Sequence, residues 1–386
     1  MIRIIHPIGQ GGFSSEFHEE DASLFVYDCG VFPCGRIAKN LIKGALPQVP
    51  ITGLFISHFD EDHISLIPEL AKDHRIKILI LPLLSDVAKA VINSVLPAEL
   101  ATVILRPKDI FGSDIKVFQI KPFEAALETV GSVSLSDSAD GELESGQVIL
   151  CTSNIENGWE YIPYNVFSQV RRRLFERACF EGKIDFDRLS DNDYASSHKK
   201  ELRRLYKTLP GSINQNSMLV YSGADVSRFC EVMTISGNDS IVWNKEACLF
   251  TGDYDFTQFA EVTKHLGKHR LERIGLAQIP HHGAWQSNVD IPLAIADENL
   301  WFVQFGTRNS FGHPSTAIVS KLEVGTWNKV FMVTENPSSL LRQLIRSTDN
   351  SRQYERKPFH GNGSVFHTGT KALSGSVNLS FNRNKV

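Results

Sequence analysis

Short apolar runs separated by turn residues fill the first hundred positions of the chain. Between two of them, Ile64–Arg75 carries apolar residues at helical spacing, which predicts a helix. The runs that predict strands are 2–8, 23–27, 51–57 and 76–81. The resulting order of strand, loop, helix and strand is that of a layered α/β protein, in which loops at the carboxyl ends of strands gather functional side chains.

The pattern changes character twice in the rest of the chain. From about 101 to 164, apolar runs between turn residues predict further strands, at 102–106, 115–120, 132–136 and 147–153. From Asn165 to Pro210, two segments with helical periodicity predict a helical insertion. Strands and helices alternate again after it. Strands are expected at 217–222, at 247–251, up to 279, at 300–305 and at 364–368, and a helix at 256–266.

Composition limits the class of protein. Hydrophobic residues make up 42% and charged residues 22% of the chain, which suits a sizeable core. A net charge of −4 argues against a protein that is basic all over. The six cysteines are scattered with no CxxC pair, so we expect a reduced, cytoplasmic protein without a zinc ribbon. No signal peptide or membrane-length apolar stretch is visible, so neither a membrane span nor a membrane partner is expected.

The charge is unevenly distributed. Residues 165–210 contain 11 basic and 7 acidic residues, a net +4, so the rest of the chain carries −8. The insertion could therefore hold the phosphate backbone of a nucleic acid. The alternative is an ordinary solvated helical pair, and the sequence leaves both open. The candidate contacts are Arg171, Arg172, Arg173, Arg203 and Arg204, with Arg177, Lys199 and Lys200 nearby.

A dense cluster of metal-binding residue types follows the third predicted strand. The sequence His58-Phe59-Asp60-Glu61-Asp62-His63 places five potential ligands in six positions. Two imidazoles and three carboxylates so close together perturb one another unless a cation lies among them. Nitrogen and oxygen donors suit two adjacent divalent ions. The alternative is a solvated turn in which Asp62 caps the next helix.

Three distant segments favour the metal site. Each follows an apolar run, as the first cluster does, so each is expected at the end of a strand. A solvated aspartate or a structural histidine would be the ordinary explanation for any one of them alone. The segments are Thr251-Gly252-Asp253, Pro280-His281-His282-Gly283 and Gly312-His313-Pro314.

Taken in order, these motifs resemble the metallo-β-lactamase superfamily, whose usual signature is HxHxDH. The chain is more similar still to the soluble β-lactamase-like domain of the competence protein ComEC and its stand-alone relatives. That group shares a longer series, which runs here from about residue 3 to 368. Its members in this chain are Gly9-Gln10-Gly11, Asp28-Cys29-Gly30, Ser57–His63, Asn214–Ser217, Thr251–Asp253, Pro280–Gly283 and Gly312–Pro314.

The resemblance implies a fold and a metal centre. The fold would be an α/β four-layer αββα sandwich spanning 1–370, with the helical insertion at 165–210 and a polar tail at 371–386. Two divalent ions would bind at one edge of the two sheets, the first on His58 and Asp60. The second would bind to Asp62, His63 and one of His281 or His282, with Asp253 bridging both ions and Asp28 orienting a ligand.

Two positions depart from the usual pattern of the superfamily. Asp60 stands where a histidine is common, and Asn216-Ser217 occupies the stretch that usually supplies a loop histidine to the first site. The first site is therefore rich in oxygen, which favours Mn²⁺ or Mg²⁺ over Zn²⁺ there. Two ions of Zn or Mn, with Mg as an option, are expected overall.

The implied activity is hydrolysis by a metal-activated water, with Asp62 and His313 taking part directly. His313 would protonate the leaving oxygen or bind a phosphate, with Ser287, Arg308 and Ser310 close enough in sequence to help. A phosphodiester, in a nucleic acid or a nucleotide, is the preferred substrate. The alternatives are a lactone, thioester or other acyl substrate, or a non-catalytic binding module.

Overall fold

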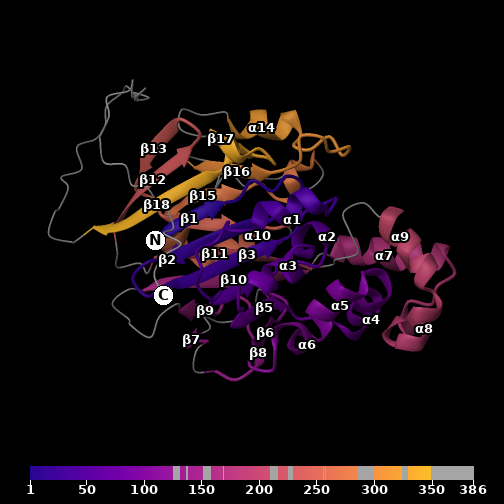
Figure 1. Cartoon of the computed structure of the whole chain (residues 1–386). Coiled ribbons are helices and arrows are strands. Elements are labelled where there is room, and N and C mark those ends of the chain that lie inside the picture. Colours follow the sequence, from indigo (N-terminus) through magenta and orange to yellow (C-terminus); the bar gives the residue numbers. More distant parts are fainter. Residues whose placement is uncertain are drawn as a thin grey trace. The chain divides into compact units, whose positions relative to one another are not determined.

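Two large sheets stacked face to face form the centre of the protein (Figure 1). This computed structural model describes residues 1–348 except 125–130, 136–137, 151–157, 168, 209–215, 225–228, 255, 257, 286–298 and 324–328. The strand expected at 364–368 and the tail expected at 371–386 lie outside the described residues.

The first sheet has ten strands, antiparallel on one side and parallel on the other. Strand β1 pairs with β18, which joins the two ends of the described chain. In spatial order the strands are β13 (Asp239–Trp243), β12 (Phe229–Ser236), β18 (Leu341–Thr348), β1 (Ile2–Ile5), β2 (Phe13–His18), β3 (Ser23–Cys29), β4 (Gly53–Phe55), β5 (Ile78–Pro82), β6 (Lys116–Ile120) and β8 (Gly141–Leu143).

The second sheet has eight strands, of which the last four along the chain are parallel. In spatial order they are β17 (Lys329–Val333), β16 (Leu300–Gln304), β15 (Ile274–Gln278), β14 (Ala247–Phe250), β11 (Asn216–Ala224), β10 (Trp159–Phe167), β9 (Val148–Leu150) and β7 (Ser132–Ser134). Strands β11 and β10 are antiparallel and form its centre.

Successive side chains of one strand enter different hydrophobic cores. In β5, Ile78 and Ile80 pack between the two sheets, whereas Leu79 and Leu81 pack under the outer helices. Strand β16 divides its side chains in the same way on the second sheet. Because side chains alternate along a strand and both faces are buried, these strands appear in the sequence as unbroken apolar runs.

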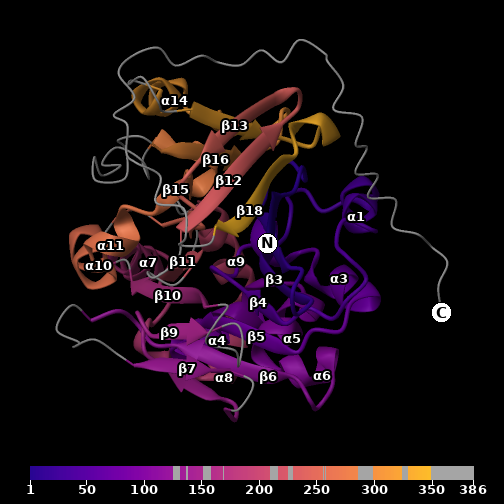
Figure 2. The ribbon, with the colours of Figure 1, turned by 90° about the vertical axis from the view of Figure 1, so that its left-hand side faces the viewer.

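Helices cover the outer face of each sheet, so the layers are helix, sheet, sheet, helix (Figure 2). The predicted α/β class and αββα arrangement are confirmed. On the first sheet lie α1 (Arg36–Ile42), α2 (Glu61–Ile64), α3 (Ile67–Asp73), α4 (Asp86–Val95), α5 (Ala98–Leu105) and α6 (Pro107–Phe111). On the second lie α10 (Phe259–Leu266), α11 (Lys268–Leu271) and α14 (Thr316–Leu322). No helix in the described part of the chain is long and apolar enough to cross a membrane.

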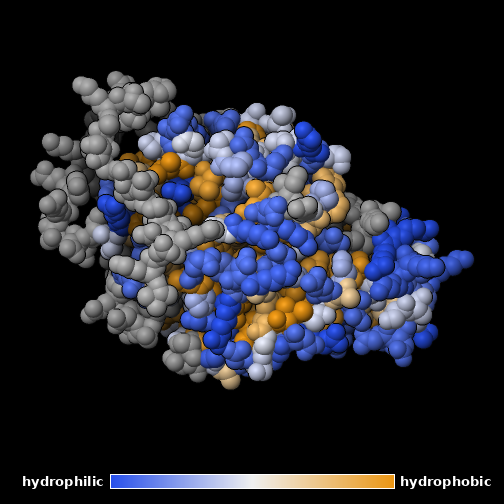
Figure 3. Space-filling model, viewed as in Figure 1, coloured by the Kyte–Doolittle hydropathy of each residue, from blue (hydrophilic) through white to orange (hydrophobic). Residues whose placement is uncertain are grey.

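The segment between β10 and β11 forms a helical arm, residues 169–208, with its own apolar core against α4. Residues 165–167 were predicted to belong to the insertion but complete β10 instead. The arm projects from the end of the sandwich near α2 (Figure 1), and its surface is largely hydrophilic (Figure 3). Its helices are α7 (Gln169–Glu181), η2 (Asp187–Ser190), α8 (Asn192–Ser197) and α9 (Lys199–Thr208).

Two predicted elements are corrected. The strand expected at 102–106 is wrong, because these residues fall almost entirely in α5. Its buried residues Leu100, Val103 and Ile104 follow helical spacing, but a short apolar run is consistent with either element until packing decides. The helix expected at 64–75 is divided into α2 and α3, and a proline in the first turn of α3 marks its start.

Candidate metal centre

The carboxyl ends of parallel strands from both sheets bring the predicted ligands together. His58 follows β4, Asp60 is the N-cap residue of α2, and Asp62 and His63 lie within that helix. Asp253 follows β14 on the other sheet, and the His281-His282 pair lies in η3 (His281–Gly283) after β15. Parallel strands place their carboxyl ends at one edge, so residues almost 200 positions apart in the sequence converge.

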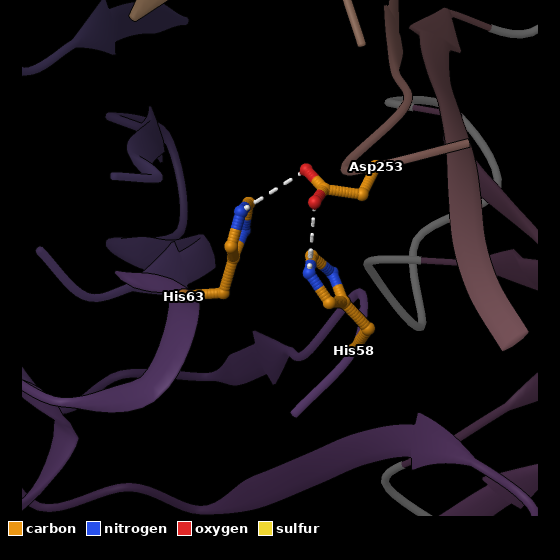
Figure 4. Close-up of side chains that lie close together, drawn as sticks. All are labelled: His58, His63 and Asp253. Atoms are coloured by element: carbon orange, nitrogen blue, oxygen red, sulfur yellow. Dashed lines mark ion pairs between the residues drawn. The ribbon is translucent and has the colours of Figure 1, made fainter. Parts of the chain in front are cut away.

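Asp253 lies between two imidazoles (Figure 4). Its Oδ1 is 3.3 Å from Nε2 of His63, and its Oδ2 is 3.4 Å from Nε2 of His58. All three side chains are buried. One carboxylate therefore presents a different oxygen to each of two histidines, as the predicted bridging role requires.

A second group of donors adjoins the first through His63. Nε2 of His282 lies 2.9 Å from Oδ2 of Asp62, and His63 is within reach of both. Nδ1 of His282 is 2.8 Å from the carbonyl oxygen of Gln304, which can only accept, so the ring carries its proton on Nδ1. Nε2 then faces the carboxylate with a lone pair, unless a second proton or a cation lies between them.

Asp28 and Ser57 fix the orientation of the two first-sheet histidines. Oδ2 of Asp28 accepts from Nδ1 of His63 at 2.8 Å and from the Ser57 hydroxyl at 2.7 Å. The Ser57 hydroxyl has thus used its proton and accepts from Nδ1 of His58 at 2.9 Å. Both rings carry their proton on Nδ1 and direct Nε2 into the cluster, which is how outer carboxylates prepare histidines for a metal.

The donor atoms fit divalent ions. The Nε2 atoms of His58 and His63 are buried and make no hydrogen bond in the described structure. Their distances to Asp253 are longer than ordinary hydrogen bonds. Metal–ligand bonds of about 2.1 Å place neighbouring ligand atoms roughly 3 to 3.5 Å apart. Two buried Nε2 atoms beside a carboxylate at this spacing form a donor set that fits divalent cations.

Opposite charges hold the cluster together in the absence of a metal. Burial and the neighbouring His63 lower the pKa of His58, but Asp253 and Asp60 raise it to about 9. Burial also opposes protonation of His63, yet three nearby aspartates, Asp28 first, hold its pKa well above the usual value. Burial raises the pKa of Asp62, but His63 and His282 lower it to about 2. Asp62 therefore remains an acceptor at any ordinary pH.

Asp60 and His281 lie at the side of the first predicted site. Oδ2 of Asp60 is 3.6 Å from Nε2 of His58, and Nε2 of His281 is 3.8 Å from Oδ2 of Asp253. Asp60 precedes α2 as its N-cap residue but makes no capping hydrogen bond with its side chain. Asp62 lies inside the helix, so the alternative in which it caps the helix does not hold. His282 adjoins Asp62, whereas His281 adjoins the oxygen that faces His58.

Two glycines allow the loops to approach so closely. A Cβ atom on Gly30 would lie 2.4 Å from the backbone of His63. Gly252 has φ of +54°, and a Cβ there would lie 2.7 Å from the side chain of Ser57. Any larger residue at either position would push Asp253 or His63 away from the cluster.

His313 lies beside the paired histidines on a loop after β16. Its ring stacks at 6.5 Å on His282 and lies edge-on to His281 at 5.7 Å, measured between ring centroids. Burial, then the two neighbouring rings, lower its pKa to about 4. Asn309 holds the loop, since its side chain accepts from the His313 N–H at 3.1 Å and donates to the His313 carbonyl at 2.8 Å.

The structure shows no contact between the metal centre and the other predicted substrate-binding residues that it describes. Arg308 and Ser310 are exposed on the loop that carries His313, and Ser287 lies outside the described residues. In the helical arm, Arg172 pairs with Glu176 at 2.7 Å, and Arg203 donates to the carbonyl of Val95 at 3.3 Å. The remaining predicted contacts of the arm include Arg173 and Arg204, both exposed, and Arg171, whose side chain is outside the described set.

The strands that flank the arm nevertheless end near the metal centre. Phe167 ends β10 before the arm and Asn216 begins β11 after it, and the two residues pair with each other. The next residue, Ser217, accepts a hydrogen bond from the Asp253 N–H at 3.1 Å through its hydroxyl. The sequence contained the stretch that replaces the usual loop histidine, and the structure shows that Ser217 there supports Asp253.

Of the residues that orient the ligands, the sequence identified Asp28 but neither Ser57 nor Gln304. Ser57 was visible only as part of a motif, and Gln304 only as a polar residue ending an apolar strand. Gln304 accepts from His282 through its carbonyl, while its side-chain amide donates to the carbonyls of His6 and Phe13, each at 3.0 Å. The one feature of the sequence that could have indicated Gln304 is a polar residue at the end of an apolar run.

Comparison with known proteins finds remote structural similarity only. No family model matches the sequence, and no curated protein matches it. The metallo-β-lactamase fold protein YhfI from Bacillus subtilis is 9% identical with a TM-score of 0.42, over 90% of this chain and 99% of that one. The protein ST1585 from Sulfolobus tokodaii, of the metallo-β-lactamase superfamily, is 13% identical with a TM-score of 0.26, over 65% and 62%. A long form of RNase Z from yeast is 9% identical with a TM-score of 0.30, over 72% and 32%.

Proposed function

We propose that this protein is a metal-dependent hydrolase of the metallo-β-lactamase fold that cleaves phosphodiesters. The observation that carries the proposal is the position of Asp253, with one oxygen facing His58 and the other facing His63. A single carboxylate shared by two imidazole donors, with Asp62 and His282 adjoining, is suited to two ions held a short distance apart.

The residues of the chain would divide the work as follows. Asp28 and Ser57 hold the Nδ1 side of both histidines and direct Nε2 inward, so cations would replace the Nε2 protons with little movement of the rings. Two bound divalent ions would supply Lewis acidity and lower the pKa of a water. His313, on the open side of His281 and His282, is placed to hydrogen-bond a substrate oxygen.

Two observations support a phosphodiester over an acyl substrate. Three carboxylates, those of Asp60, Asp62 and Asp253, give the centre an oxygen-rich donor set, which suits Mn²⁺ or Mg²⁺ in at least one site. The basic helical arm is rooted next to Asp253, where a polyanion could reach both. Kinship with the ComEC-type domains rests on the motif order alone and is part of this proposal.

The test combines metal content with a substrate screen. Mass spectrometry of the purified protein should find up to two divalent ions per chain. The protein loaded with Mn²⁺, Mg²⁺ or Zn²⁺ should then hydrolyse DNA, RNA or a cyclic nucleotide in preference to a lactone or thioester. Hydrolysis of acyl substrates alone would replace the phosphodiester proposal with the acyl one. A protein that binds no metal under any loading condition would rule out both.

A further inference from the structure

Exposed aromatic side chains gather on the loops of the metal centre. Among the described residues, four aromatic side chains are well exposed to solvent, and three of them lie within four positions of a metal-site residue in the sequence. These are Phe32 at 46%, Trp285 at 47% and Phe311 at 58%, which we call the aromatic rim; the fourth is Phe180 on α7 at 84%. Single exposed hydrophobics are ordinary, but a group at one functional edge indicates a binding surface.

The loops that carry two of these rings are linked by hydrogen bonds. The Phe32 N–H donates to the Gln10 carbonyl at 2.7 Å, and the Gln10 side chain accepts from the Gly306 N–H at 3.3 Å. Gly306 starts the loop that ends at His313. The loops that carry Phe32 and Phe311 are therefore joined to each other, and Trp285 follows η3 after one residue, Ala284.

Phe311 lies in a continuous stack of rings that leads to a predicted metal ligand. Its ring is stacked on His313 with centroids 5.8 Å apart, and His313 is stacked in turn on His282 at 6.5 Å. A group held on Phe311 would thus be two rings away from a ligand of the metals. In a single strand, a base on Phe311 and a phosphodiester at the metals would belong to neighbouring nucleotides, so one strand could engage both.

Asn309 holds Phe311 in this position without help from a core. Its side-chain oxygen accepts from the N–H groups of Phe311 and His313, at 3.2 and 3.1 Å. Its amide donates to the carbonyls of Gly306 and His313, at 2.6 and 2.8 Å. A loop that is ordered in advance loses little entropy when a ligand binds. The exposed ring is therefore presented by a fixed loop.

We propose that the aromatic rim, through Phe311, stacks the unpaired bases of a single-stranded nucleic acid whose phosphodiester lies at the metal centre. This inference rests on the proposed phosphodiesterase function and names its substrate. Aromatic side chains bind single strands through the faces of the bases, which a duplex hides between neighbouring pairs. The basic helical arm beside the centre would contact the backbone of the same strand.

The experiment measures binding separately from cleavage. A fluorescently labelled single-stranded oligonucleotide with phosphorothioate linkages, which resist hydrolysis, is titrated with the metal-loaded protein, and the anisotropy is followed. Three other probes have the same linkages. They are an abasic strand, a duplex, and a single strand with the other sugar, which is RNA where the first probe is DNA. The variants are Phe311→Leu, which keeps apolar area and loses the ring, Phe311→Trp, which keeps a ring, and Val242→Ala. Val242 is 60% exposed on the edge strand β13, outside the arm and the aromatic rim, and serves as the control for an exposed hydrophobic side chain.

We expect Phe311→Leu to weaken binding of the single strand about 5- to 20-fold, within the range for loss of one stacked base. Phe311→Trp should bind as tightly as the wild type, and Val242→Ala should change the affinity less than 2-fold. The abasic strand and the duplex should bind the wild type weakly. Equal binding of the abasic strand, or equal losses in Phe311→Leu and Val242→Ala, would overturn the proposal while leaving hydrolysis of small phosphodiesters unaffected. Ring-dependent binding without hydrolysis of any phosphodiester would instead contradict the proposed function.

Discussion

At the scale of single residues, the centre depends on how each imidazole is turned. His58, His63 and His282 all carry the Nδ1 proton toward a fixed acceptor and leave Nε2 facing a carboxylate. The acceptors are a hydroxyl, a carboxylate and a backbone carbonyl, so three unlike groups produce the same result. Asp253 is the residue on which the two first-sheet histidines converge.

Replacing Asp253 with Ala should lower the metal content of the purified protein and reduce its turnover by more than about 100-fold, because loss even of an outer partner of a metal site costs 10- to 100-fold. Metal per chain is measured by mass spectrometry and turnover with a small chromogenic phosphodiester. Asp239→Ala, which removes an exposed carboxylate paired with Lys329, serves as the control and should leave both unchanged. Near wild-type turnover in Asp253→Ala would contradict the two-metal centre.

Replacing Asp60 with His should shift metal preference toward Zn²⁺, because it restores a nitrogen donor beside His58. The activity of the metal-free protein is measured after addition of Zn²⁺, Mn²⁺ or Mg²⁺ in turn. Glu61→His adds a histidine one position away and should not change the order of the three ions. If Asp60→His also leaves that order unchanged, Asp60 does not contact a metal.

At the scale of elements, the helical arm has an apolar core of its own, and the strands that flank it end near the metal centre. Phe175, Leu202 and Leu205 pack with Ala90 and Val91 of α4, so the arm is attached to the first sheet as well as to β10 and β11. Part of its positive charge is used inside the arm, because Arg172 and Arg177 each pair with a glutamate one turn later. Its exposed basic residues include Arg173, Lys200 and Arg204.

Changing Arg173, Lys200 and Arg204 together to Gln should weaken binding of long DNA or RNA. Each lost phosphate contact removes roughly 0.7 to 0.9 from the slope of log affinity against log salt, so the slope should become about 2 to 3 shallower. Hydrolysis of a small phosphodiester should persist, because the metal centre is untouched.

The matched control for the arm is the triple change of Lys264, Lys268 and Lys329 to Gln. These residues lie in α10, in α11 and at the first position of β17, which is the end of the second sheet opposite the metal centre. This triple variant loses the same three positive charges and should leave the salt dependence of nucleic-acid affinity unchanged. An equal effect of both triple variants would mean that net charge, and not the arm, determines affinity.

At the scale of the whole molecule, polar groups buried under the metal centre link its stability to pH. His6 is buried, stacks on Phe13 with centroids 4.1 Å apart, and makes a 2.7 Å hydrogen bond to the Ser15 hydroxyl. Burial lowers its pKa from 6.5 to about 3. Because the folded pKa lies below the unfolded one, stability from the neutral ring is complete above about pH 6.5 and is lost as the pH falls toward 3.

The free energy of unfolding of the wild type should therefore fall by about 2 kcal/mol more than that of His6→Gln between pH 7 and pH 5. The measurement is urea denaturation of both proteins at the two pH values. Other titrating groups, including those of the metal centre, are common to both proteins and cancel in the comparison. Parallel losses of stability would show that His6 takes up its proton in the folded state as readily as in the unfolded state.

The sequence by itself determined much of the layered fold and which loops bear chemistry. Buried strands appear as apolar runs in any context, because both of their faces must avoid water, and the polar motifs that end them mark the edge where loops meet. The motif order predicted the αββα sandwich and brought His58, His63 and Asp253 forward as ligands. All three lie together in the structure, with Asp62 and His282 beside them.

Only the tertiary structure decided what depends on contacts between distant segments. The run at 102–106 lies almost entirely in α5 because its apolar side chains pack, at helical spacing, in the core between the first sheet and its outer helices. The difference between His281 and His282 follows from the Gln304 carbonyl, which lies on another strand. The support that Ser217 gives Asp253 across two strands likewise has no local signal. A sequence records the donors available to a metal, but the direction of each lone pair is set by partners that only folding brings within hydrogen-bonding distance.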